Sequence, residues 1–227
     1  MLGPRPAGVD EVDFLSLLSE TNRRRVLEGS TKAAYPSGTI AFHPDGPDRP
    51  FVVDRGLARV FGTVPDGRQS TFTFVHVHEL AGGTAIASYP PRVQIQVVVD
   101  SMLTILDLDR VRSLAASEAE ICAAVAVHLA SRVRAAFALI SVRSLGTIRE
   151  RVAYDLLDRA CQSQLSVGRL EANATHADLA DSIGSSREVV SRALRDLRAA
   201  GIIDTAPGVV RVVQPLHLAA IVRAFVI

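Results

Sequence analysis

Arginine and carboxylate side chains gather on one side of a helix that the sequence predicts between residues 186 and 198. At about 100° per residue, its polar members fall within one arc of about 140°. They are Arg187, Glu188, Ser191, Arg192, Arg195 and Arg198. Guanidinium groups bind guanine edges and phosphates, and a carboxylate accepts a hydrogen bond from cytosine N4. Because apolar residues fill the opposite arc, we expect this helix to pack on one face and to contact DNA with the other.

The residues just before this helix predict a shorter helix followed by a tight turn. Thr175 is a suitable N-cap for the shorter helix, and Gly184 permits a sharp turn after it. Either Ser185 or Ser186 then caps the second helix. Ser185 and Glu188 also fit a capping box, so Glu188 serves either the helix end or a DNA base. The alternative interpretation is an ordinary helical hairpin with a solvated arginine face.

A β-hairpin is expected directly after the second helix. The segment Gly201-Ile-Ile-Asp leads to a Pro207-Gly208 turn, and an apolar run follows from Val209 to Val213. Two extended runs around such a turn are typical of a hairpin. A hairpin in this place is the wing of a winged helix-turn-helix, and it favours DNA binding over a plain helical hairpin.

Composition and charge set wider limits. The chain has 227 residues, of which 48% are hydrophobic, and a formal net charge of +1, which suits two compact domains without a global basic field. Residues 146–227 contain ten arginines and nine acidic residues, so the positive charge is concentrated on one helix. Cys122 and Cys161 lie far apart without a CxxC motif, which argues against an iron–sulfur site or a disulfide scaffold. For both cysteines a small buried side chain is preferred over a redox switch.

The sequence has no secretory signal pattern and no run of about 20 apolar residues. We therefore expect a soluble cytoplasmic protein without a membrane partner. The cysteine usage fits a reducing cytoplasm. Of the 25 basic residues only Lys32 is a lysine, which suggests a GC-rich genome such as an actinobacterial or mycobacterial one.

The first part of the chain changes from helical to strand periodicity. Apolar residues at helical spacing predict an opening helix or helix pair in residues 9–28. From Thr31 onward the period is two, and Pro-Asp-Gly turns separate the runs. The strands are marked by Ile40 and Phe42; Val53, Leu57 and Phe61; Phe72 and Phe74; Val93, Ile95 and Val97; and Leu103, Ile105 and Leu106. Several strands without intervening helices predict an antiparallel barrel or jelly roll over about residues 30–108.

A long helix is expected from Leu108 to Leu145, because no glycine or proline occurs between Arg92 and Gly146. Its apolar stripe comprises Ile121, Val125, Leu129, Val133, Ala136, Leu139 and Ile140. A helix of about thirty residues beside one small domain needs a partner, so we expect a homodimer through residues 114–145. Gly146-Thr147 ends this helix and a further helix covers residues 148–161. The polar segment 162–173 is expected to be irregular.

This order of elements resembles the Crp/Fnr family of bacterial transcription regulators. The resemblance rests on Tyr35-Pro-Ser-Gly-Thr-Ile-Ala-Phe, on Val53-Asp-Arg-Gly, and above all on Ile183-Gly-Ser-Ser-Arg-Glu-Val-Val-Ser-Arg-Ala-Leu. It implies an α+β protein with a cyclic-nucleotide-binding-like β jelly roll in residues 1–112. A dimerisation helix would occupy residues 113–145, and a winged helix-turn-helix residues 146–227. The resemblance also implies a homodimeric regulator, not an enzyme, that binds double-stranded DNA and contacts RNA polymerase.

The resemblance assigns roles to single residues of the helix-turn-helix. Arg187, Glu188 and Arg192 match the family's base-reading Arg-Glu-x-x-x-Arg pattern, which implies TGTGA-like palindromic sites. Thr175 and the Ser185-Ser186 pair match its phosphate contacts. The complete set of expected DNA-binding residues is Thr175, His176, Ser185, Ser186, Arg187, Glu188, Ser191 and Arg192.

The expected effector site departs from the cyclic-AMP-binding members of the family. Glu79 stands for their ribose contact and Arg92 for their phosphate contact, but the neighbouring serine is lost. Ala136-Phe137 align with a Thr-Ser pair that contacts adenine in the founding member, and they cannot form those hydrogen bonds. Each lost hydrogen bond is worth about 0.5–1.5 kcal/mol, so we expect cyclic AMP to bind weakly and to change DNA affinity little. No other cofactor and no metal is expected.

The segment His76-Val-His78 allows two other interpretations of the first part of the chain. We expect it on a strand, with both histidine rings on one face and next to Glu79. Such a group can hold a metal in a cupin-like enzyme, although the sequence offers no evident third ligand downstream. The same histidines are candidates for haem sensing in a regulator of the same family, and the two cysteines for redox sensing.

Overall fold

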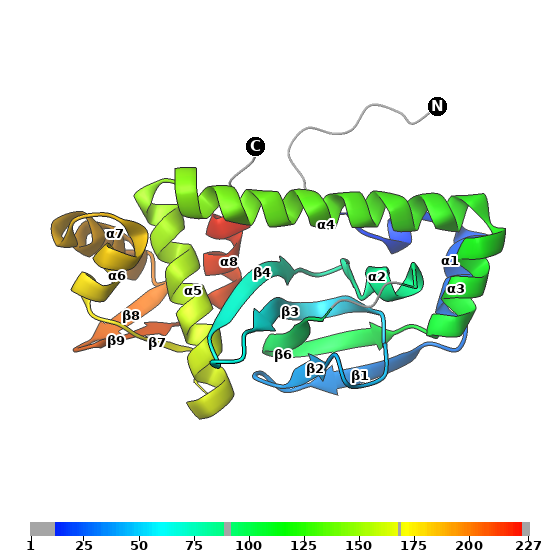
Figure 1. The fold of residues 1–227 in the computed structure, drawn as a ribbon, viewed down its shortest axis with the longest axis horizontal. Coiled ribbons are helices and arrows are strands. Elements are labelled where there is room, and N and C mark those ends of the chain that lie inside the picture. Colours follow the sequence, from blue (N-terminus) through cyan, green and yellow to red (C-terminus); the bar gives the residue numbers. More distant parts are fainter. Residues whose placement is uncertain (1–11, 89–91, 168, 224–227) are drawn as a thin grey trace.

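The computed structural model describes residues 12–88, 92–167 and 169–223. A sheet body at the N-terminal side, a long helix along it and a C-terminal body at the end of that helix follow one another (Figure 1). This order confirms the α+β fold class expected from the sequence. The expected opening helix before residue 12 and the end of the expected winged helix-turn-helix after residue 223 lie outside the described residues.

The sheet body is one antiparallel sheet of six strands. The strands are β1 (Thr31–Tyr35), β2 (Ile40–Phe42), β3 (Phe51–Thr63), β4 (Gln69–Val75), β5 (Leu80–Ala81) and β6 (Gln94–Ile105). Their main order is β1-β6-β3-β4, with β2 paired to β6 and β5 paired to β3. The expected antiparallel arrangement is thus confirmed. The two runs expected at residues 93–97 and 103–106 form a single strand, β6.

The two longest strands, β3 and β6, bend together at a glycine. Gly56 has a φ of +115°, a conformation that residues with a Cβ rarely adopt. A Cβ at this position would lie 1.9 Å from the Ser101 Oγ of β6. The register between the strands shifts on both sides of Gly56. Only glycine permits this close crossing, which curls the sheet around its core.

The helix expected from Leu108 to Leu145 is two helices. Glu118 has an extended backbone (φ −115°, ψ 110°) and separates α3 (Leu108–Ser117) from α4 (Ala119–Leu145). Its carboxylate lies 2.8 Å from the Arg25 guanidinium, which fixes the corner to the opening helices. The other helices of this part are η1 (Leu15–Leu17), α1 (Glu20–Leu27) and α2 (Gly83–Ile86).

Two different apolar faces run along α4. One face packs on the rest of the chain and buries Ile121, Val125 and Leu139. The other leaves Val133 and Phe137 more than half exposed, at 54% and 59%. The single stripe expected from the sequence is therefore divided between these faces. Since Val125 and Leu139 contact their own chain, they do not offer a surface to a second copy.

By length and composition alone, α4 is apolar enough to cross a membrane, in contrast to the sequence-based expectation. However, three polar side chains of α4 are enclosed by the protein. His128 and Ser131 are 1% and 8% exposed, and Arg132 forms an ion pair with the buried Glu79. In this structure α4 is therefore a helix that packs on the protein with one face and leaves a second, apolar face uncovered.

The C-terminal body contains the expected helix-turn-helix and hairpin. Its elements are α5 (Ile148–Val167), β7 (Glu171–Asn173), α6 (His176–Ile183), α7 (Arg187–Ala199), β8 (Ile203–Ala206), β9 (Val209–Val212) and α8 (Pro215–Arg223). The expectation of an irregular segment from 162 to 173 is wrong, because α5 extends to Val167 and β7 pairs with β9. The polar residue Gln164, which suggested a loop, is buried and hydrogen bonded to the sheet body.

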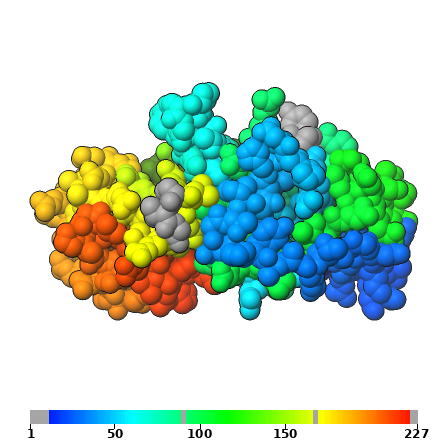
Figure 2. All heavy atoms as spheres, turned by 90° about the horizontal axis from the view of Figure 1, so that it is seen from below, coloured from blue at the N-terminus to red at the C-terminus, as the bar shows by residue number. Residues whose placement is uncertain are grey.

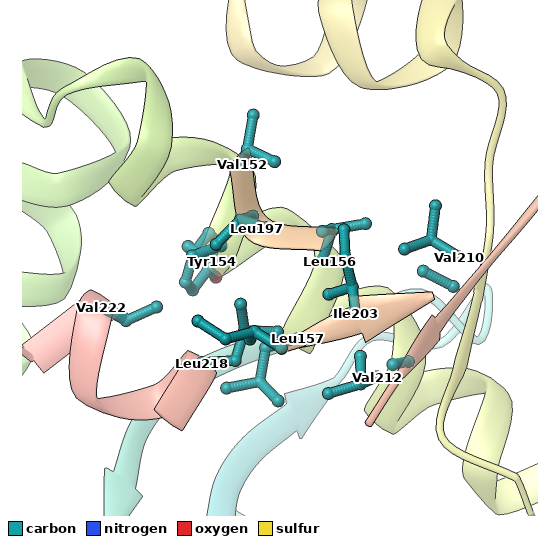
Figure 3. Close-up of a cluster of buried hydrophobic side chains, with 14 of the residues drawn as sticks. Val152, Tyr154, Leu156, Leu157, Leu197, Ile203, Val210, Val212, Leu218 and Val222 are labelled. Carbon is teal, nitrogen blue, oxygen red and sulfur yellow. The ribbon is translucent and has the colours of Figure 1, made fainter. Parts of the chain in front are cut away.

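One apolar cluster joins the elements of the C-terminal body to the sheet. Figure 3 shows Leu156 and Leu157 of α5 meeting Leu197, Ile203 and Leu218. The same cluster continues into the sheet body through Leu57, Phe74 and Val98. In Figure 2 the C-terminal body, coloured yellow to red, accordingly lies directly against the blue and cyan sheet body.

His128 of α4 is a buried histidine whose ring is uncharged in the folded protein. Its ring centroid lies 6.1 Å from that of Phe14, and its Nδ1 has no hydrogen-bond partner among the described residues. Burial, and secondly the positive charge of Arg132, lower the pKa of His128 from 6.5 to about 3, although Glu79 acts in the opposite direction. The ring is therefore neutral in the folded protein at any physiological pH.

We predict that acid weakens the fold through His128. Below pH 6.5 the unfolded chain binds a proton that the folded chain excludes until about pH 3, so the free energy of unfolding falls across this window. At about pH 5 the loss is about 2 kcal/mol. Urea unfolding at about pH 7.5 and pH 5, at one protein concentration, measures it. In His128→Leu the loss of unfolding free energy between the two pH values should be smaller by about 2 kcal/mol. An equal loss in the wild type and in His128→Leu would contradict the lowered pKa of His128.

Candidate nucleic-acid interface and ligand pocket

The start of α6 is fixed by a reciprocal cap. The Thr175 hydroxyl accepts a hydrogen bond from the Asp178 N–H at 3.2 Å, and the Thr175 N–H donates to the Asp178 carboxylate at 2.8 Å. These contacts, the backbone one first, hold the pKa of Asp178 below its usual range. Thr175 is therefore an N-cap, as expected, and its hydroxyl is already hydrogen bonded within the protein.

A left-handed glycine forms the turn between the two helices. Gly184 has a φ of +63° and ends α6, and the Ser185 N–H donates to the Ala180 carbonyl at 2.9 Å. Ser186 is the N-cap of α7, and its hydroxyl accepts from the Val189 N–H. Of the two serines proposed as caps, the structure thus selects Ser186. Its N3 residue is Val189, so the alternative capping box of Ser185 with Glu188 does not form.

α7 separates its packed and exposed residues as the sequence predicts. The buried side chains are Val190, Ala193, Leu194 and Leu197, and the exposed ones are Arg187, Glu188, Arg192, Arg195 and Arg198. The Ser191 hydroxyl is half-buried and lies 2.8 Å from the His176 Nδ1, which ties α7 to the start of α6. His176 and Ser191 thereby hold the two helices together at the edge of the exposed face.

The charged groups at the start of α7 are available to a ligand. Arg187 and Arg192 have no acidic partner within 4 Å among the described residues, whereas Arg198 lies 3.8 Å from Asp204 of the hairpin. Hydrogen bonding from its own backbone N–H, and then from Ser186, keeps the pKa of Glu188 below its usual range. The helix start therefore presents two guanidinium groups and an ionised carboxylate to solvent.

A groove of about 420 Å³ runs between this helix start and the hairpin. It brings together Thr175, His176 and Arg187 with the hairpin turn at residues 205–208. The turn was expected as a wing but its residues were not named as contacts. The Pro207-Gly208 pair could have indicated these contacts, since such a pair forms a turn at the tip of a hairpin and exposes its backbone groups. Ser185 and Ser186 lie at the adjoining helix cap, outside the groove lining.

The second candidate site surrounds Glu79, between the sheet and α4. Glu79 is 1% exposed, and one carboxylate oxygen lies 2.7 Å from the Arg132 Nη2 while the other accepts from the His76 N–H at 2.8 Å. Arg132 also donates to the Phe74 carbonyl at 3.1 Å. Arg132 was not among the residues expected at this site. Its role as the partner of Glu79 depends on a contact between residues 53 positions apart.

The cavity beside this ion pair is small, about 60 Å³. Ala135, Ala138 and Leu139 of α4 line it, and so do Ala219 and Val222 of α8. Sites for drug-sized ligands have volumes of about 300–1,000 Å³. The C-terminal helix thus occupies one wall of a pocket that offers no room for a nucleotide in this arrangement.

The residues expected to complete a cyclic-nucleotide site are not brought to this cavity. Arg92 is exposed and does not line it, and Ala136 and Phe137 lie on α4 outside its lining. Phe137 instead belongs to the exposed face of the helix. The structure therefore joins Glu79 to Arg132 and leaves Arg92 apart.

The structure also places the residues of the alternative metal, haem and redox sites. β4 ends at Val75, so His76 and His78 lie in a turn and not on a strand, and His78 has a φ of 68°. No cluster of three or more potential metal ligands occurs within residues 12–88, 92–167 and 169–223. Burial raises the pKa of the Cys161 thiol to about 12, so it is protonated at neutral pH. Cys161 is buried as expected, whereas the expectation of a buried side chain is wrong for Cys122, which is exposed on α4.

Comparison with known proteins relates the chain to transcription regulators. The family described as "Crp-like helix-turn-helix domain" matches residues 150–221, from α5 into α8. The transcriptional regulator LdrP of Thermus thermophilus is 31% identical over 173 residues, which are 75% of this chain and 84% of that protein. The CRP-like cAMP-activated global transcriptional regulator of Mycobacterium tuberculosis is 27% identical over 174 residues, 74% of this chain and 78% of that protein.

The likeness extends to solved structures. The crystal structure of a transcriptional regulator of the Crp/Fnr family from Eubacterium rectale has a TM-score of 0.57 and 21% sequence identity. The match covers 91% of this chain and 95% of that chain. It therefore includes the sheet body, the long helix and the C-terminal body in one alignment.

Proposed function

Because the chain belongs to the Crp/Fnr family of transcription regulators, we propose that it acts as a homodimer that reads a TGTGA-like palindrome with the exposed face of α7. In this proposal it works in the cytoplasm and contacts RNA polymerase at the promoters it controls. Residues 1–112 form the sensor part and residues 146–227 the DNA-binding part. The proposed dimerisation helix between them, residues 113–145, contains α4, which begins at Ala119.

The observation that carries the DNA-binding proposal is the uncompensated charge at the start of α7. Arg187 and Arg192 can each place a guanidinium fork on guanine O6 and N7, and Glu188 can accept from cytosine N4. The groove beside them, with the wing turn on its other side, leaves space for the sugar–phosphate backbone. Thr175, Ser185 and Ser186 lie at helix starts, where backbone N–H groups favour phosphate.

The uncovered face of α4 supports a dimer. Its exposed residues repeat at alternating intervals of three and four, which is the spacing of a two-stranded coiled coil. They are Ala119, Ala123, Ala126, Ala130, Val133, Phe137, Ile140 and Ser144, and we call them the α4 seam. In a parallel pair the two α7 helices lie at the same end of the molecule, toward which α4 runs (Figure 1). Two half-sites one helical turn apart, about 34 Å, then fit the pair.

We predict that a charge in the α4 seam separates the dimer. Phe137→Glu places a carboxylate in the middle of the apolar seam, and sedimentation at micromolar concentration should give the mass of one chain instead of two. Binding to the palindrome should fall with it, because a single half-site loses the second set of contacts. Ala116→Glu on the exposed surface of α3 is the control and should remain dimeric. A wild-type protein that is monomeric at this concentration would refute the proposal.

We predict that Arg187 reads a base. Arg187→Ala should remove discrimination worth about 1–3 kcal/mol at one symmetric pair of positions and leave the others unchanged. Arg195→Ala removes an exposed arginine farther from the helix start, and should weaken all sequences alike. Binding-site selection on the three proteins at fixed salt measures both effects. If Arg187→Ala lowers affinity equally for every base, Arg187 is a phosphate contact.

We predict that the pocket at Glu79 binds cyclic AMP only weakly. The Arg132 guanidinium already neutralises the buried carboxylate, and the cavity is too small for the nucleotide unless α8 moves. Titration calorimetry should give a dissociation constant above about 1 μM, where binding free energy is about −8.2 kcal/mol. Arg92→Ala should leave this value unchanged, since Arg92 does not line the cavity. Sub-micromolar binding would contradict the proposed pocket.

A further inference from the structure

A fully buried arginine lies between the sheet body and the C-terminal body. The Arg59 side chain of β3 is 0% exposed, and its guanidinium carbon lies 4.4 Å from the centre of the Phe61 ring. Its Nη2 forms an ion pair of 2.9 Å with the Asp158 carboxylate of α5. Its Nε donates to the Thr71 hydroxyl at 2.6 Å. Arg59 therefore belongs to the sheet body and finds its counter-charge on the DNA-binding part.

Further hydrogen bonds surround this ion pair and cross the same boundary. Gln96 of β6 donates to the Cys161 carbonyl and to the Gln164 side chain, each at 3.1 Å. Gln164 in turn donates to the Val98 carbonyl at 3.0 Å. Thr71 also donates to the Asp158 carboxylate. We call Arg59, Thr71, Gln96, Asp158 and Gln164 the interdomain network.

This network removes the freedom that joined domains usually have. Domains in one chain commonly move relative to each other unless their interface is large and apolar. Here a buried ion pair and an apolar cluster with Leu57, Phe74 and Val98 join α5 to the sheet. Separating the bodies would leave the Arg59 and Asp158 charges without each other and expose this apolar surface.

The interdomain network is separate from the ligand cavity. None of its five residues lines the cavity beside Glu79 and Arg132. In the orientation that the network fixes, α6 and α7 lie at the far end of the molecule, away from the sheet, and the base-reading side chains of α7 are exposed (Figure 1). The five polar side chains of the network thus act on α7 from outside the cavity, although Phe74 of the adjoining apolar cluster lines it.

We propose that the interdomain network holds α7 in its DNA-binding orientation without a bound nucleotide, so that this regulator binds DNA independently of cyclic nucleotide. The inference rests on the proposed DNA-binding function and adds the way in which it is regulated. Arg59 and Asp158 are positioning residues in this proposal, since they lie neither on the exposed face of α7 nor in the lining of the cavity beside Glu79.

The test uses the full-length wild-type protein, two variants of the interdomain network and one control variant. Arg59→Met/Asp158→Leu removes both charges together and retains apolar volume, so no unpaired buried charge remains. Gln164→Leu removes only the hydrogen bonds of Gln164 with Gln96 and with the Val98 carbonyl. It replaces the double variant if that variant does not fold. Arg211→Met, which breaks an exposed ion pair with Glu171 inside the C-terminal body, is the matched control.

The first readout needs no DNA. Trypsin sites at Arg143 and Arg149 flank Gly146, at the junction of α4 and α5. Cleavage there should be at least about tenfold faster in the double variant, a change of about 1.4 kcal/mol in the opening equilibrium, and about threefold faster in Gln164→Leu. The control should be cleaved at the wild-type rate. Equal rates in all four proteins would overturn the network as the connection between the bodies.

The second readout is affinity for the selected palindrome with and without saturating cyclic AMP. Wild type should bind equally in both conditions within about twofold, and the double variant should bind at least about tenfold more weakly in both. A tenfold or larger gain on adding cyclic AMP to wild type would overturn the inference. If wild type selects no sequence at all, the proposed function fails, while the cleavage rates still decide whether the network joins the bodies.

Discussion

A guanidinium group with no exposed surface joins the two bodies of this molecule. A buried ion loses several kcal/mol of solvation, and only a well-formed set of partners offsets this loss. Arg59 draws its hydrogen-bond partners from strands β4 and β6 on one side and from α5 on the other. Neither body alone supplies all of these partners, so the buried charge joins the sheet to α5.

The long helix α4 links this arrangement to the proposed dimer. Its inner face contributes Ile121 and Val125 to the core beside α1 and α3, and Leu139 and Val142 to the cluster shared with α5. Its outer face is uncovered and is the surface proposed for a second copy. In the proposed dimer, one helix would pack on the sheet with one face and lie along the symmetry axis with the other.

Periodicity and turn residues predicted the parts of the fold that depend on local sequence. The two faces of α7, the cap at Thr175, the turn at Gly184 and the Pro207-Gly208 hairpin all follow from spacing within a few residues. The break at Glu118 left no such mark, because it depends on an ion pair with Arg25 far along the chain.

Contacts between distant segments account for what the sequence did not reveal in the sites. Glu79 was expected as a ligand residue, but its partner Arg132 comes from another element and is 53 positions away. Arg59 carried no signal at all, since an arginine in a strand usually faces solvent. An apolar stripe likewise reports that a helix is buried but not on which of its faces, so α4 needed the structure to separate its two surfaces.

The side chains of the α4 seam differ in volume along the helix. Four alanines occupy its first half, and its second half has Val133, Phe137 and Ile140, followed by Ser144. Since helix axes approach to about 8–10 Å depending on the side chains between them, two such helices would lie close along the alanines and farther apart at Val133, Phe137 and Ile140. A dimer built on this seam would therefore widen from its alanine half toward its second half, which is the half nearer to α7.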